Sequence, residues 1–161
     1  MFSHLSPEIL KRTKKILFEG CLVQNLNVLL QTLASTHVEC HTCLLLDTLA
    51  AVSSLPHLTT IVLHECVALK HLDDLEGSFP LLSFHVESCL SLQSIKGIEE
   101  KFSIEELTIK DCPSLVTLSL IEKMTSLKKL NLMHVRPLYN LEALRTLPKL
   151  QELIIDGQKL L

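Results

Sequence analysis

The sequence contains very few of the residues that build phosphate-binding loops and base-stacking surfaces. It has four glycines, one tyrosine and no tryptophan in 161 residues. Four glycines leave no glycine-rich phosphate loop, and neither a nucleophile elbow nor a paired-carboxylate motif occurs. Single-stranded nucleic acid needs aromatic platforms as well as cations, and the outward-facing strand positions have neither a basic stripe nor interleaved aromatics. We therefore expect no enzyme activity, no catalytic residue and no cofactor.

Charge and hydropathy argue against two further classes of protein. A net charge of −3 and a pI near 6.2 give no electrostatic basis for binding nucleic acid. Hydrophobic residues make up 47% of the chain, but no run approaches the roughly 18 apolar residues that cross a bilayer. The N-terminus lacks the apolar core and cleavage site of a secretory signal. We expect an intracellular, cytoplasmic protein without a membrane partner, and the basic N-terminal residues leave mitochondrial import as an alternative.

What the chain has instead is a repeat of 23 residues that runs from Leu58 to Leu161. Written as a pattern it is L-x-x-L-x-L-x-x-C-x-x-L-x-x-L-x-x-L, close to known short repeats. A degenerate copy starts at Ser35, so about six coils fill residues 35–161 and the last one is incomplete. One unit cannot bury its apolar side chains alone, so neighbouring units must stack on it. Two of the apolar columns are Leu58, Leu81, Ile104, Leu127, Leu150, and Ile61, Phe84, Leu107, Leu130, Leu153.

Each unit predicts a strand followed by a return segment. The residues around L-x-L alternate between inward and outward positions, which is the period of a β-strand. Stacked strands would form a parallel sheet along one wall. The L-x-x-L-x-x-L spacing that follows suits a helical turn, a 3₁₀ segment or an irregular stretch on the opposite wall.

Residues 1–34 depart from the repeat and are predicted to form a helical N-terminal cap. Ser6 suits an N-cap and Pro7 the first helical position. Ile16 and Leu17 continue the helical face of Ile9 and Leu10. A second helical face consists of Leu22, Val23, Leu26, Leu29, Leu30 and Leu33. The residues through which RNA contact could be made are Lys11, Arg12, Lys14 and Lys15.

Four of the six cysteines occupy one column at intervals of 23 residues. They are Cys43, Cys66, Cys89 and Cys112. A secreted disulfide framework would pair cysteines across loops, whereas one cysteine per coil indicates a reduced thiol buried as a small hydrophobe. Cys40 and Cys43 have the spacing of a Cys-x-x-Cys motif, so on spacing alone the pair could also be redox-active or form half of a zinc site. Zinc needs two further ligands and no second Cys-x-x-Cys exists, so burial is favoured.

These features resemble the leucine-rich repeat family over about residues 35–161. The cysteine at the consensus asparagine position, as in residues 107–115, is similar to variants in plant immune receptors and kinetoplastid proteins. The resemblance implies an α/β fold: a leucine-rich repeat solenoid with a concave parallel β-sheet, an irregular or short-helical convex side and a helical N-terminal cap. It also implies that the concave sheet binds another protein.

The departures from the family pattern limit what it implies. Val135 and Gln158 replace the cysteine in the last two coils, and no nucleotide-binding segment is present. A plant receptor function is therefore not supported. The chain stops at Leu161 within a coil, so we expect either that the native protein continues or that a partner covers this end.

Outward-facing strand positions and the C-terminal rim are the candidate protein-binding surface. Interface anchors are usually Trp, Tyr or Arg, which the wall lacks and the rim supplies. On the wall the candidates are His37, His41, Thr60, Val62, His64, Ser83, His85, Glu87, Thr108, Lys110, Lys129, Asn131 and Met133. At the rim they are Met133, His134, Arg136 and Tyr139. Since adjacent strands lie about 4.8 Å apart, His41, His64 and Glu87 could share a metal, but we favour a polar surface and predict no metal site.

The function expected is a non-catalytic protein–protein interaction module that acts as an adaptor or structural subunit of a larger complex. Two alternatives stay open. One is a subunit of a ribonucleoprotein assembly, such as a ribosome or its maturation machinery, that contacts RNA through the basic helix. The other is a substrate-receptor or regulatory subunit whose catalytic partner is a different chain.

Overall fold

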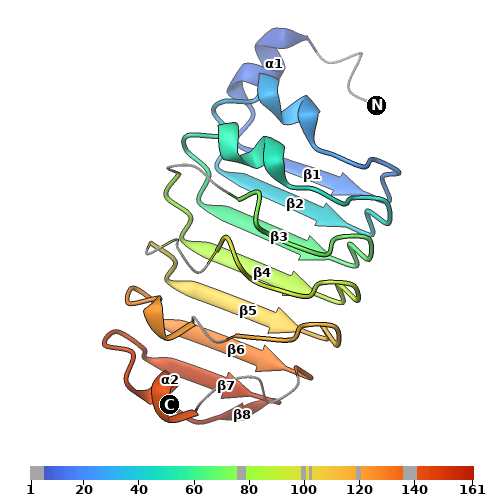
Figure 1. The fold of residues 1–161 in the computed structure, drawn as a ribbon. Coiled ribbons are helices and arrows are strands. Elements are labelled where there is room, and N and C mark those ends of the chain that lie inside the picture. Colours follow the sequence, from blue (N-terminus) through green and yellow to red (C-terminus); the bar gives the residue numbers. More distant parts are fainter. Residues whose placement is uncertain (1–5, 76–78, 99–100, 102, 119–120, 136–140) are drawn as a thin grey trace.

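A single sheet organises the computed structural model, which describes residues 6–75, 79–98, 101, 103–118, 121–135 and 141–161. Its eight strands lie in space in the same order as in the sequence (Figure 1). Neighbours from β1 to β7 are parallel, and only β8 is antiparallel. The strands are β1 (Lys15–Glu19), β2 (His37–His41), β3 (Thr60–His64), β4 (Ser83–Glu87), β5 (Glu106–Lys110), β6 (Lys129–Met133), β7 (Glu152–Ile155) and β8 (Gln158–Lys159).

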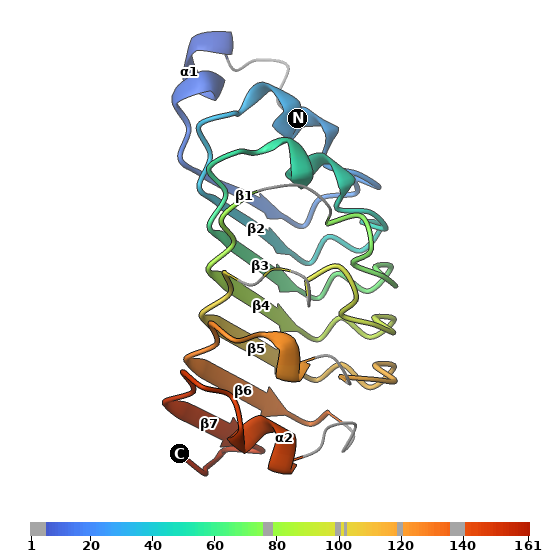
Figure 2. The same ribbon diagram turned by 60° about the vertical axis from the view of Figure 1, so that its left-hand side comes forward.

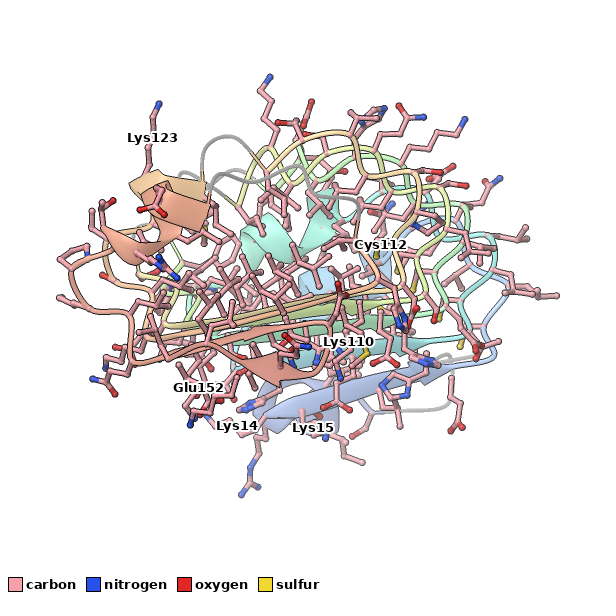
Figure 3. The ribbon with its side chains drawn as sticks, turned by 90° about the horizontal axis from the view of Figure 1, so that it is seen from below. Lys14, Lys15, Lys110, Cys112, Lys123 and Glu152 are labelled. Carbon is pink, nitrogen blue, oxygen red and sulfur yellow. The ribbon has the colours of Figure 1, made fainter. Side chains whose placement is uncertain are left out.

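Short helical segments lie on the wall opposite the sheet, as the return spacing predicts (Figure 2). They are the 3₁₀ helices η1 (Asn27–Gln31), η2 (Ala50–Ser54) and η3 (Ile121–Lys123), and the α-helix α2 (Leu141–Arg145). Seen along the stack, Lys110 and Glu152 lie on the sheet side and Lys123 on the opposite wall (Figure 3). The fold is thus a solenoid with two walls around one core.

The apolar columns of successive coils merge into one continuous core. Leu58, Ile61, Leu107 and Leu130 are each at most 1% exposed and belong to the same cluster. The strands from β1 to β6 alternate buried residues with exposed or partly exposed ones, so their inward side chains fill the space between the walls. A single coil has no such interior, and its neighbours supply it.

One residue per coil, directly after the strand, adopts a left-handed backbone conformation. Its N–H continues the ladder, as where Thr42 donates to the carbonyl of His64 at 2.8 Å and Ser88 to that of Lys110 at 3.0 Å. Residues other than glycine disfavour the left-handed region, because their Cβ atom comes too close to the backbone. The row, called here the corner row, consists of Gly20, Thr42, Glu65, Ser88, Asp111 and His134, with φ between 49° and 58°.

The helical prediction for Ile16 and Leu17 is wrong. Helix α1 (Pro7–Arg12) starts as predicted, with the Ser6 hydroxyl oxygen accepting from the N–H of Ile9 at 3.4 Å, but it ends at Arg12. Residues 15–19 form β1, whose Ile16 and Phe18 point into the core. Lys15 pairs with residue 37, an interval of 22 residues. This coil is one residue shorter than the others, so a comparison at 23-residue intervals does not detect the strand.

The second helical face predicted for residues 22–33 is also wrong. Only Asn27–Gln31 is helical, as a single 3₁₀ segment. Leu26 and Leu29 are buried, whereas Leu22, Leu30 and Leu33 are exposed. The sheet therefore includes a strand that precedes Ser35, and α1 and η1 are the helical segments among the described residues of the predicted cap.

At the other end, the assignment of Gln158 and Leu161 to inward columns is wrong. Asp156 and Gly157 have φ of 46° and 78° and reverse the chain, as Asp-Gly pairs commonly do in hairpins. The residues that follow form β8, which pairs antiparallel with β7. Gln158 and Leu161 are consequently exposed, and the edge of β7 is covered by a hairpin strand.

Candidate binding surface

The outward-facing strand residues form three columns across the sheet, in the register that the sequence predicts. The first is His37, Thr60, Ser83, Glu106, Lys129 and Glu152; the second is Glu39, Val62, His85, Thr108, Asn131 and Ile154; the third is His41, His64, Glu87, Lys110 and Met133. Most of these side chains are half-buried by their neighbours. The wall is therefore a close-packed surface.

The sequence interpretation missed the first member of each column. Lys15, Leu17 and Glu19 of β1 lie in register with the columns of β2. The sequence interpretation placed these three residues in a helix, where their side chains would not continue the columns of the sheet. The strand pattern of alternating buried and exposed residues in Lys15–Glu19 is the signal that could have found them.

Opposite charges face each other across neighbouring strands. The Nζ atom of Lys15 lies 2.8 Å from Oε1 of Glu39, and that of Lys129 lies 3.1 Å from Oε1 of Glu106. The hydrogen bond and the negative charge of Glu106 raise the pKa of Lys129. These charges already have partners within the chain, and they are exposed to solvent. They therefore offer an incoming charged ligand little extra attraction.

The histidine-rich part of the wall lies on β2, β3 and β4. His85 Nε2 is 3.1 Å from Oε2 of Glu87, which is also 4.0 Å from Nζ of Lys110. The rings of His41 and His64 have centroids 5.9 Å apart. Within the described ranges, no three His, Cys, Asp or Glu side chains are grouped as a metal site would require. The set His41, His64 and Glu87 therefore has no geometric support as a metal site.

The second column carries no formal charge between β3 and β7, apart from the titratable ring of His85. Val62 and Ile154 give it apolar ends, with Thr108 and Asn131 between them. Oδ1 of Asn131 is buried, with no hydrogen-bond partner among the described residues. This strip offers neutral hydrogen-bonding groups beside apolar contacts.

The C-terminal rim is only partly within the described residues. Arg136 and Tyr139 lie outside them. Met133 is half-buried, and His134 belongs to the corner row. Its N–H donates to Oδ1 of Asp156 at 2.8 Å, and its Nδ1 lies 2.7 Å from Oδ1 of Asp111. His134 is held between neighbouring coils by these contacts.

All six cysteines are free and buried, which confirms the burial predicted for the cysteine column. The thiols of Cys21, Cys43, Cys66, Cys89 and Cys112 donate to backbone carbonyls near the strand ends. Cys43 Sγ, for example, lies 3.6 Å from the oxygen of Phe18, and Cys112 Sγ lies 3.2 Å from that of Lys110. Burial raises the pKa of Cys112 to about 11. Cys40 and Cys43 are both inaccessible, which supports a packing role for them.

The stacked coils, the parallel sheet and the short helices opposite it define a leucine-rich repeat fold. No protein family model matches the chain, and no curated protein is significantly similar to it. Two solved structures are similar in fold. One is the leucine-rich repeat domain of the type III effector XopL, with a TM-score of 0.74 and 17% identity over 89% of this chain and 52% of that one. The other is an internalin (InlF) from Listeria monocytogenes, with a TM-score of 0.57 and 14% identity over 91% of this chain and 48% of that one.

The chain thus spans about half the length of either structure. At these identities the likeness shows the fold alone, and it does not extend to the cysteine content. Within the described part of the chain, no helix is both long and apolar enough to cross a membrane.

Proposed function

We propose that the concave wall binds a protein partner and that the chain serves as an adaptor or structural subunit of a larger complex. The observation that carries the proposal is the neutral second column between rows of internally paired charges. A protein segment with apolar and amide side chains matches that strip, because it gains contacts there without stripping water from unpaired charges.

The partner is therefore expected to bind through shape and hydrogen bonds. A nucleic acid would instead need unpaired cations. Lys15 is held by Glu39 at 2.8 Å, and Lys11 lies 4.0 Å from Glu8. These contacts reduce the positive charge that the N-terminal residues offer to RNA.

The test is affinity capture with the full chain as bait, using the native sequence and two wall variants. Val62→Arg and Thr108→Arg each place a long cation in the strip, where it replaces a neutral contact. Both are expected to lower the recovery of the specific partner at least tenfold. Because the side chains of Val62 and Thr108 are only half-buried, the thermal midpoint should change little.

Val116→Arg is the matched control, since Val116 lies outside the strands and is 67% exposed. It should leave the recovery unchanged. Partners captured equally by all four chains would place the binding surface elsewhere and contradict the proposal. Recovery that disappears after ribonuclease treatment would favour the ribonucleoprotein alternative.

A further inference from the structure

The two ends of the sheet are finished differently. At the C-terminal end the hairpin strand β8 pairs with β7. Among the described residues, β1 is the outermost strand at the N-terminal end and pairs only with β2 (Figure 1). Helix α1 packs on η1 and, being helical, supplies no strand to the outer edge of β1. An open strand edge offers its backbone groups to another strand.

The residues that face this open edge can be identified from the hydrogen bonds on the other side. The carbonyl of Lys14 accepts from β2, and the N–H of Gly20 donates to β2. Backbone groups of a strand alternate in direction from one residue to the next. The N–H and carbonyl groups of Lys15, Leu17 and Glu19 therefore point away from β2, toward the open edge.

These three residues are complementary to themselves when a second strand runs the opposite way. A two-fold axis at Leu17 sets Leu17 against Leu17 of the second copy and Lys15 against Glu19. All three are then hydrogen-bonded pairs, because their backbone groups face the edge. On the inner side the same register sets Ile16 against Phe18, both of which are already buried within their own chain.

We propose that β1 is a homodimer interface, in which two copies of this chain join their sheets edge to edge through antiparallel β1 strands. Lysine on an edge strand ordinarily blocks pairing. Here each lysine meets a glutamate of the second copy, and opposite charges directly across strands stabilise the pair. The interface is isologous, as a two-fold dimer requires.

Exposed apolar side chains near this end fit the same arrangement. Leu22, shortly after β1, is 74% exposed. The antiparallel arrangement brings the segment after β1 of one copy to the end of β1 at which α1 of the second copy lies (Figure 2). A groove there is lined by Leu10, Val28 and Leu29 among others. The segment that carries Leu22 would lie beside this groove of the other copy.

Sedimentation equilibrium of the full chain over a wide concentration range tests the interface. The native mass is expected to rise from that of one 18.1 kDa chain to that of two. Lys15→Glu alone sets glutamates against each other at both ends of the interface, and Glu19→Lys alone does so with lysines. Each variant by itself should sediment as a single chain.

An equimolar mixture of the two variants is the decisive arm. In the mixed dimer both pairs again have opposite signs, so the two-chain mass should return. Glu19→Lys leaves the contact of Lys15 with Glu39 intact, so the behaviour of this variant reports on the interface without that loss. Circular dichroism melts establish that both variants fold.

Val116→Lys is the control for added exposed charge away from β1 and should behave as the native chain. A native chain that stays single at every concentration would overturn the proposal and leave the edge to a different protein strand. A two-chain mass for either variant alone would overturn it as well, because association would then use another surface.

Discussion

At the scale of single residues, the buried thiol column contributes to both packing and hydrogen bonding. A cysteine fills a small inward position after each of five successive strands, where its thiol reaches a backbone carbonyl. Desolvation disfavours the thiolate, so burial raises the pKa of Cys112 to about 11 from 9.0. The Cys112 thiol therefore resists ionisation for as long as the chain is folded.

The raised pKa of Cys112 predicts a loss of stability at alkaline pH. Above pH 9 the unfolded thiol releases its proton while the folded one retains it, so the free energy of unfolding falls as pH rises toward 11. The loss is about 2–3 kcal/mol, since one pKa unit corresponds to about 1.4 kcal/mol. Urea unfolding at pH 8, 9, 10 and 11 measures it. Cys112→Ala, which lacks the thiol, should show a shallower decline; equal slopes for the two chains would contradict the assignment.

Leu107 represents the leucine columns because it is 1% exposed within the continuous core. Leu107→Ala removes most of its buried side chain and leaves a cavity between coils. We expect a loss of about 2–5 kcal/mol in the free energy of unfolding. Chemical denaturation measures the loss, with Val116→Ala at an exposed site as the matched control. An unchanged midpoint for Leu107→Ala would mean that this position is not buried in solution.

At the scale of the element, each coil depends on a backbone corner that its side chain does not favour. The corner row holds Thr42, Glu65 and Ser88 in the left-handed region, where only Gly20 is free of a Cβ penalty. The ladder of N–H groups requires this geometry at every strand end. Side-chain contacts support some corners, as where the Thr42 hydroxyl donates to Oε2 of Glu65 at 3.0 Å.

Two opposite substitutions test the corner row. A Cβ at Gly20 would meet nothing within 4 Å, so Gly20→Ala isolates the cost of φ +58° and should destabilise by about 1 kcal/mol. Ser88→Gly removes the same penalty and should stabilise by a few tenths to about 1 kcal/mol. Thermal midpoints of the two variants should move in opposite directions. A shift of the same sign in both would refute the role of the corner.

Gly97 marks a close approach between neighbouring coils. A Cβ there would lie 2.1 Å from the carbonyl oxygen of Leu72, and φ is +101°. Because the obstructing atom belongs to the backbone, Gly97→Ala should destabilise by at least about 2 kcal/mol, more than Gly20→Ala does. Denaturant unfolding of both variants ranks the two sites. Equal losses would indicate that the coils have room to separate at Leu72.

At the scale of the whole molecule, stability is shared between neighbouring coils. Each strand from β2 to β6 pairs with one strand on either side. Between the described elements, contacts join neighbouring coils and no distant ones, as expected for a quasi-one-dimensional array. A defect in one coil should therefore weaken its direct neighbours first.

Hydrogen exchange can follow how far such a defect spreads. In Leu107→Ala, the amide groups of β4, β5 and β6 should lose the most protection, because these three coils share the cavity. Protection in β2 should fall less, since three strand interfaces separate it from β5, which carries the substitution. The measurement is native-state exchange read by mass spectrometry. A uniform loss across all strands would instead indicate a single cooperative unit.

Much of the fold follows from the spacing of apolar residues, and the errors follow from interruptions of that spacing. The columns through Leu58 and Leu107 predicted the strands, their register and the two walls. The strand position of Ile16 was not predicted because its coil is one residue shorter. A comparison at 23-residue intervals therefore places Ile16 on the outward face of the sheet. Gln158 was misplaced because the turn at Asp156 ends the repeat by local backbone geometry.

The candidate surface was predictable in part for the same reason. A period of two fixes which strand residues face outward, so the columns from His37 onward were placed correctly. Which charges neutralise each other was not predictable, because it depends on side-chain reach between coils. The pairing of Lys129 with Glu106 illustrates this.

The sequence by itself determined the repeat, the inward columns and the outward-facing positions, because a fixed interval of apolar residues admits one way of stacking. Only the tertiary structure decided where the stack ends. A terminal strand is defined by the absence of a neighbour, and that depends on how the whole chain is arranged in space. The open edge of β1 and the hairpin that closes β7 are both of this kind.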